Sequence, residues 1–190
     1  MPDKNESYLM FRNLLVILSA TVLLAACETP TTGRYAISAE NNMAIKAVGA
    51  TGIGISTFAP PAKFEETCRA LGPLKVSDNL THTQYIQKAF EDELKVASAY
   101  AQAPARVTLS GKVNRLEFSS ARAMTGGSWN IDLVLTSSNS KTLTVREYYE
   151  FNSGFVATEA CRQTADAFAR AVQDLVSKAV KDPAFPALVR

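Results

Sequence analysis

The chain has 190 residues, of which 47% are hydrophobic and 20% are charged, and its formal net charge is +2 at pH 7. This length provides for one domain with a sizeable core, and the near-neutral balance gives no strong field for binding nucleic acid or an anionic lipid surface. One histidine and three cysteines are too few, at the spacing they have, for a zinc site.

An apolar run of 13 residues, 14–26, lies close to the N-terminus. A helix needs about 20 apolar residues to cross a bilayer, so this run is too short to span one and suits the apolar core of a signal peptide. It ends in Leu24-Ala25-Ala26-Cys27, which resembles the bacterial lipobox. The resemblance implies cleavage between Ala26 and Cys27 and attachment of lipid to the Cys27 thiol. An ordinary secretory signal and an N-terminal anchor helix are the alternatives.

The lipobox resemblance also implies a location. Two or more acyl chains on Cys27 would anchor the chain stably without a spanning helix. The residue after the cysteine is Glu28, whereas aspartate at this position retains enteric lipoproteins at the inner membrane, so we expect an outer-membrane protein that faces the periplasm, with the inner membrane as the alternative. Asp3 and Glu6 dilute the positive charge of the first residues, which favours translation from Met10 over the first methionine.

Three segments follow from these signals. Residues 1–26 are expected to be a lipoprotein signal peptide, residues 27–48 a lipidated cysteine with a flexible tether, and residues 49–190 a single globular domain. Lipidation of Cys27 would leave Cys68 and Cys161, for which an oxidising periplasm favours a disulfide. Two separately buried thiols are the alternative.

The domain shows alternating and helical patterns in a clear order. Apolar residues alternate with polar ones over 51–58, 107–118, 129–135 and 143–151, which predicts four strands, with a bulge near Asn114 and Arg115, a loop at 119–127 and a hairpin turn at 138–141. Spacings of three and four predict helices that begin at Thr81, with Gln84 completing a capping box, and near Thr158. The order strand-helix-strand-strand-strand-helix predicts an α+β two-layer sandwich, in which a four-stranded, mainly antiparallel sheet carries two helices on one face.

Candidate catalytic groups are sparse. The only histidine, His82, falls in the first turn of a helix and is expected to be an ordinary surface residue. The adjacent carboxylates, Glu65 with Glu66 and the run 91–93, are expected to be mostly solvated surface charge, because neighbouring helix residues point in different directions. No acid, base or nucleophile constellation emerges, so no catalytic residue is assigned and the chain is not expected to be an enzyme.

Aromatic residues on the predicted strands form one further candidate site. Trp129, Tyr148 and Tyr149 with Arg146 could stack on a sugar or a peptidoglycan fragment. About half of the residues in alternating strands must face the core, however, so core packing is the favoured interpretation.

The lipobox, the threonine-rich segment after it and the order of elements are together similar to the YajG-type outer-membrane lipoproteins, over about residues 51–185. The similarity is best in the strand-loop-strand stretch 107–151, with its Asn139-Ser140-Lys141 turn, and from Phe155 through helix 164–180 to residues 183–185. The resemblance implies a location and a fold, and it implies no reaction, substrate, cofactor or metal.

The sequence is compatible with three candidate functions. We expect a non-catalytic envelope lipoprotein that binds a protein or an envelope polymer through the open face or edge of its sheet, and no nucleic acid. An auxiliary subunit of a lipid or lipopolysaccharide transport system is the first alternative, which an apolar cavity between sheet and helices would favour. An enzyme acting on cell wall or lipid is the second alternative.

Overall fold

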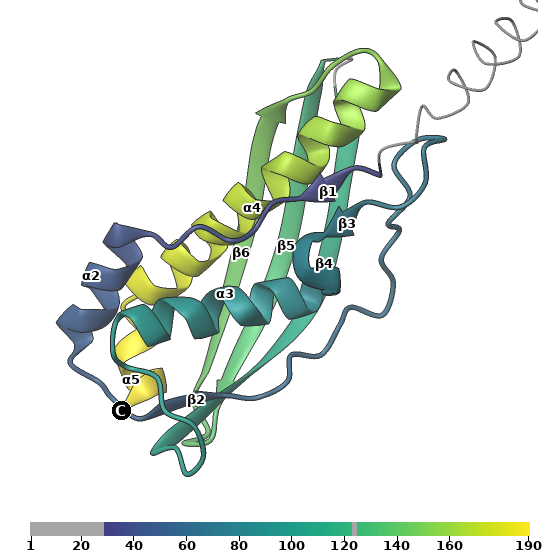
Figure 1. The fold of residues 1–190 in the computed structure, drawn as a ribbon. Coiled ribbons are helices and arrows are strands. Elements are labelled where there is room, and N and C mark those ends of the chain that lie inside the picture. The colour runs from purple at the N-terminus through teal and green to yellow at the C-terminus, as the bar shows by residue number, and fades with distance from the viewer. Residues whose placement is uncertain (1–28, 123–124) are drawn as a thin grey trace, which may run out of the picture.

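The computed structural model describes residues 29–122 and 125–190, which form an α+β sandwich with a sheet on one side and helices on the other (Figure 1). The main sheet has the strand order β2-β4-β5-β6. Its strands are β2 (Ile53–Ile55), β4 (Val107–Arg122), β5 (Gly126–Ser137) and β6 (Thr142–Asn152). β2 runs parallel to β4, and the other neighbours are antiparallel. The predicted fold class is confirmed, as is the predicted order of the four strands of the main sheet and the two long helices.

Two long helices cover one face of the sheet. α3 (His82–Val96) begins with the predicted capping box, in which the Gln84 amide donates to Thr81 Oγ1 at 3.2 Å and the Thr81 amide donates to Gln84 Oε1 at 2.8 Å. α4 (Ala157–Lys181) has 25 residues and is therefore about 37 Å long. It lies across β4, β5 and β6, so that it covers most of the helix-side face (Figure 1).

The segment expected to be a flexible tether is folded from residue 31 onward, and that prediction is wrong. β1 (Thr31–Thr32) pairs in parallel with β3 (Lys75–Val76) in a second, two-stranded sheet. α2 (Ala39–Val48) follows, with the Ser38 side chain accepting a hydrogen bond from the Asn41 amide at its start. Ile45 is buried in the core. The segment is ordered because it packs against α4 and α3, a contact that its weak local pattern does not reveal.

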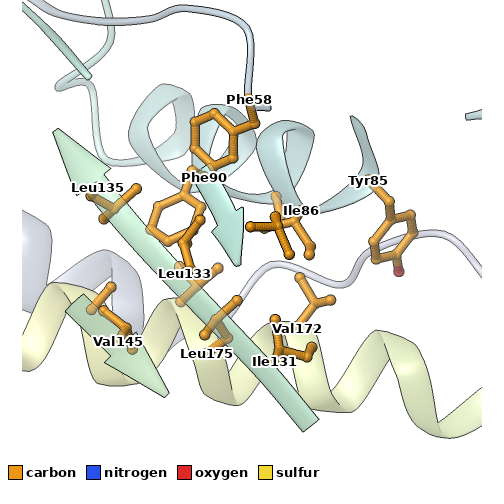
Figure 2. Close-up of a cluster of buried hydrophobic side chains, with 14 of the residues drawn as sticks. Phe58, Tyr85, Ile86, Phe90, Ile131, Leu133, Leu135, Val145, Val172 and Leu175 are labelled. Atoms are coloured by element: carbon orange, nitrogen blue, oxygen red, sulfur yellow. The ribbon is translucent and has the colours of Figure 1, made fainter. Parts of the chain in front are cut away.

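The core lies between the sheet and the two long helices. Figure 2 shows Ile131, Leu133 and Leu135 of β5 facing side chains of α3 and α4. Phe58, which follows β2, packs over Gly111 of β4, where a Cβ atom would lie 2.5 Å from the ring. Gly111 therefore makes room for an aromatic side chain at the centre of the sheet.

The long antiparallel strands match the sequence prediction in two details and differ in a third. The register shifts between Val113 and Arg115, which confirms the bulge, and the Asn139 turn joins β5 to β6. The predicted loop at 119–127 is wrong, because β4 continues to Arg122 and β5 already begins at Gly126. Gly127 lies in β5, and a Cβ atom there would lie 2.3 Å from the ring of Phe151, so this strand position requires glycine.

The chain ends on a short helix that closes the domain. This helix is α5 (Phe185–Val189). The single-turn helix η1 (Ser77–Asn79) lies earlier in the chain, between β3 and α3. Phe185 and Leu188 are each 1% exposed, so this last helix packs its apolar side chains against the core. Asn139 donates to the carbonyls of Ala187 and Arg190, both at 3.0 Å, and so ties the β5–β6 turn to this helix.

Candidate functional site

The face of the sheet opposite the helices is polar and open. Arg115, Asp132 and Arg146 are opposite one another on β4, β5 and β6, so they form a row across this face. The Arg146 guanidinium lies 4.0 Å from the Asp132 carboxylate. A shallow depression of about 490 Å³ lies over the row, and Tyr148 and Lys178 border it. These groups suit contact with a polar partner surface.

The aromatic set considered from the sequence is divided between the two faces. Trp129 is fully buried among aromatic rings, and its Nε1 donates to the Thr164 carbonyl at 2.8 Å. Tyr149 pairs with Trp129 in the register and lies on the same, helix-covered face. Arg146 and Tyr148 are exposed, and Tyr148 retains 52% of its accessible surface. The four side chains therefore do not form one stacking platform for a sugar.

β6 is a free edge of the main sheet because it pairs with β5 alone. Backbone groups of alternate residues point to opposite edges of a strand. The Lys141 carbonyl accepts from the Ser137 amide at 2.9 Å and so faces β5, whereas the Arg146 carbonyl accepts from Lys178 Nζ at 3.4 Å. The even-numbered residues of β6 therefore turn their N–H and C=O groups outward. Apart from the Arg146 carbonyl, these groups have no hydrogen-bond partner in the described part of the chain.

An ion pair between a buried carboxylate and a half-exposed amine lies beside this edge. Glu147 points toward the helices and is 3% exposed, and its Oε2 lies 2.9 Å from Lys178 Nζ. The same amine therefore contacts both the Glu147 carboxylate and the Arg146 carbonyl. An inward-pointing charge on an edge strand is one of the devices that limit indiscriminate strand pairing.

His82 is not a surface residue, and that prediction is wrong. Its side chain is 3% exposed, with ring centroids of Phe64 and Phe168 at 4.8 and 4.9 Å. Its Nε2 is buried without a hydrogen-bond partner, and its Nδ1 lies 3.8 Å from Glu66. Burial, followed by the positive charge of Lys75, lowers the pKa of His82 to about 4. The sequence held a signal for this burial, because His82 stands four residues before Ile86 on the apolar face of α3.

One carboxylate of the 91–93 run is likewise buried. Glu93 is fully buried, and its Oε1 accepts from the Tyr35 hydroxyl at 2.8 Å, the Ser38 amide at 2.9 Å and Asn41 Nδ2 at 3.3 Å. Burial, followed by the hydrogen bond to Glu93, raises the pKa of Tyr35. Glu91 instead forms an ion pair with Lys95 on the outer side of α3. Glu93 therefore joins the N-terminal segment to α3 and has a structural role.

The two cysteines of the domain are bonded. Cys68 and Cys161 form a disulfide that links the turn after residue 67 to the first turns of α4. Ala26 and Cys27, the expected cleavage and lipidation sites, lie outside the described residues.

Within 29–122 and 125–190, no three His, Cys, Asp or Glu side chains are grouped to hold a metal ion. In the same ranges no helix has the length and apolar character needed to cross a bilayer.

Comparison with known proteins bears on the fold. No family model and no curated protein matches the sequence. Among solved structures, the chain is similar to protein XCC0632 from Xanthomonas campestris, described under the family model DUF330. The match has a TM-score of 0.50 and 14% sequence identity, and it covers 79% of this chain and 90% of the other. At this identity the likeness shows a shared α+β fold.

Proposed function

We propose that this chain is a non-catalytic envelope lipoprotein, held by lipid on Cys27 at the outer membrane and facing the periplasm, that binds a protein partner along β6. The observation that carries the proposal is the exposed edge of β6, whose outward N–H and C=O groups have almost no partners in the described chain. An extended segment of a partner would add a strand there. Backbone hydrogen bonds would supply affinity, and contacts with Arg146 and Tyr148 would supply specificity.

The ion pair beside the edge supports a selective interaction. A segment that pairs with β6 must accommodate the Glu147 carboxylate on the helix side and the Lys178 amine at the edge. Leaving the buried Glu147 carboxylate without the Lys178 amine in the interface would be unfavourable, because a buried charge needs a partner. Segments that fit are therefore few, as expected for a dedicated partner rather than for aggregation.

The other sequence-based functions receive less support. A lipid-carrying transport subunit would need an apolar cavity, whereas the space between sheet and helices is filled by the core (Figure 2). The depression over Arg115, Asp132 and Arg146 is shallow and has a lining of mixed polar and apolar character. An envelope polymer would need an aromatic platform, and Trp129 is buried. Membership of the YajG-type lipoproteins remains a proposal from the sequence motifs.

Crosslinking in the living cell tests whether a partner protein binds along the edge of β6. A photo-crosslinking residue at Thr144, which is exposed on β6, should capture one defined protein that mass spectrometry identifies. Capture should weaken with Tyr148→Ala, which removes a side-chain contact, and be lost with Tyr148→Pro, because proline also removes an outward N–H without removing a bond to β5. A crosslinker at exposed Asp174 on α4 serves as the control.

Two outcomes would change the proposal. Capture that survives Tyr148→Pro, in a variant that melts at the wild-type temperature, would refute pairing along β6. Capture of only a second copy of this chain would make β6 a self-association edge and would refute a separate partner.

A further inference from the structure

Exposed apolar side chains gather at the end of the molecule where α4 begins. Phe155 and Val156 directly precede α4 and are 73% and 64% exposed, and Leu71 is 42% exposed in the turn after Cys68. The Cys68–Cys161 disulfide joins that turn to α4. We call Leu71, Phe155 and Val156 the apolar end.

A partly buried network of hydrogen bonds holds the apolar end in place. Arg69 donates to the Phe155 carbonyl at 2.9 Å and to the Ser120 carbonyl at 2.7 Å. Its Nε also donates to Ser120 Oγ at 3.1 Å. Arg69 thereby ties three segments together, namely the turn that it occupies, the end of β4 and the connection into α4. Arg69 therefore holds the backbone next to the exposed apolar side chains in place.

The N-terminal segment lies along α4 and leads back toward this end. Thr32 Oγ1 donates to the Ala165 carbonyl at 2.9 Å, and the Ala36 carbonyl accepts from Gln173 Nε2 at 3.0 Å. From Thr32 to Ala36 the segment therefore runs alongside α4 from Ala165 to Gln173, in the same direction as the helix. Followed back from Thr32, the described chain heads to the start of α4 (Figure 1).

The length of chain to Cys27 limits how far the proposed lipid can lie from the domain. Cys27 precedes Thr32 by five residues, which can span at most about 18 Å. The start of α4 lies about 12 Å from Ala165 along the helix axis. The opposite end, where Lys181 pairs with Glu40 of α2, lies about 24 Å from Ala165 and is beyond that reach. A bilayer that holds the lipid of Cys27 can therefore meet the apolar end and not the α2 end.

We propose that the apolar end contacts the bilayer and inserts Phe155, Val156 and Leu71 among the lipid headgroups beside the anchor. This inference rests on the proposed lipidation of Cys27. Phenylalanine, leucine and similar side chains partition into the boundary between headgroups and acyl chains. The acyl chains supply the attachment, and the apolar end fixes the orientation. With α4 rising from the bilayer, the edge of β6 is kept at a constant angle to the membrane surface.

Fluorescence quenching by brominated phosphatidylcholine tests this contact. The full lipidated protein is reconstituted in vesicles that contain the brominated lipid, and Phe155→Trp is compared with Met43→Trp. Met43 is 63% exposed on α2, at the other end of the molecule, so it is a matched control. Wild-type Trp129 is fully buried and gives the baseline. We expect the tryptophan at position 155 to be quenched several-fold more strongly than the one at position 43, and Val156→Trp to behave in the same way.

The outcomes separate this inference from the proposed function. Protein that floats with the vesicles while positions 155, 156 and 43 are quenched equally would overturn the membrane contact alone. Protein that does not float with the vesicles would overturn lipid attachment, and the inference with it.

Discussion

Replacing His82 with leucine should remove most of a loss of stability that the wild-type protein suffers between pH 7.5 and pH 5. Burial, followed by the charge of Lys75, lowers the pKa of His82 to about 4, whereas a histidine in the unfolded chain has a pKa of about 6.5. Below pH 6.5 the unfolded state therefore binds a proton that the folded state excludes. The stabilising contribution is complete above pH 6.5 and falls as the pH drops toward 4. The two pKa values give a loss of about 2 kcal/mol between pH 7.5 and pH 5.

Denaturant unfolding at the two pH values measures this loss, with the disulfide intact. Because each variant is compared with itself at two pH values, any cost of repacking leucine cancels. The loss in His82→Leu should be about 2 kcal/mol smaller than in wild type. Phe64→Leu alters the same cluster without a titrating group and should show the wild-type loss. An equal loss in His82→Leu would refute the reasoning, as would imidazole NMR signals of this single histidine that titrate near pH 6.5.

Three further tests by substitution probe the framework. Replacing Cys68 and Cys161 together with alanine should lower the free energy of unfolding by about 2 to 5 kcal/mol in a denaturant titration, and an unchanged value would show that the bond does not stabilise the fold. Glu93→Ala should cost about 3 kcal/mol because it leaves three donors of the N-terminal segment unpaired, whereas Glu91→Ala should cost less than about 1 kcal/mol. Similar losses in both would contradict the role of Glu93. Gly111→Ala should cost about 1 to 3 kcal/mol, seen as a lower melting temperature, because its Cβ would meet the aromatic ring that covers it.

The sheet and the long helices could be predicted because their signals are local. Alternation over 107–118, 129–135 and 143–151 places β4, β5 and β6, and the bulge at Asn114 follows from a shift in phase of that alternation. The capping box at Thr81 involves residues only three positions apart. These features need no knowledge of distant contacts.

The burial of His82 and Glu93 and the position of α2 were not predicted, because they depend on contacts between distant segments. His82 and Glu93 occupy positions of the apolar face of α3, four before Ile86 and three after Phe90, but polar side chains there were expected in solvent. They are buried because the N-terminal segment and the aromatic cluster cover both ends of that face. α2 carries a weak pattern, in which Ile45 is its buried apolar residue, and its place is set by α3 and α4. Tertiary packing overrides local preference in all three cases.

The sequence predicts that the sheet has an open face or edge, but it does not identify the strand at that edge. Alternation indicates that a sheet has one open face, and it does not say which strand forms the edge. That depends on β2 pairing in parallel with β4, which leaves β6 free. The ion pair of Glu147 with Lys178 is also beyond sequence reasoning, since it joins β6 to a helix residue 31 positions later.

The proposal that this is a lipid-anchored envelope protein is tested most directly by the mass of its mature N-terminal peptide. We expect a peptide that begins at Cys27 and carries two or more acyl chains, and we expect Cys27→Ser to abolish both the lipid and the cleavage before residue 27. An unmodified Cys27 within an uncleaved chain, or cleavage at another position without lipid, would contradict it.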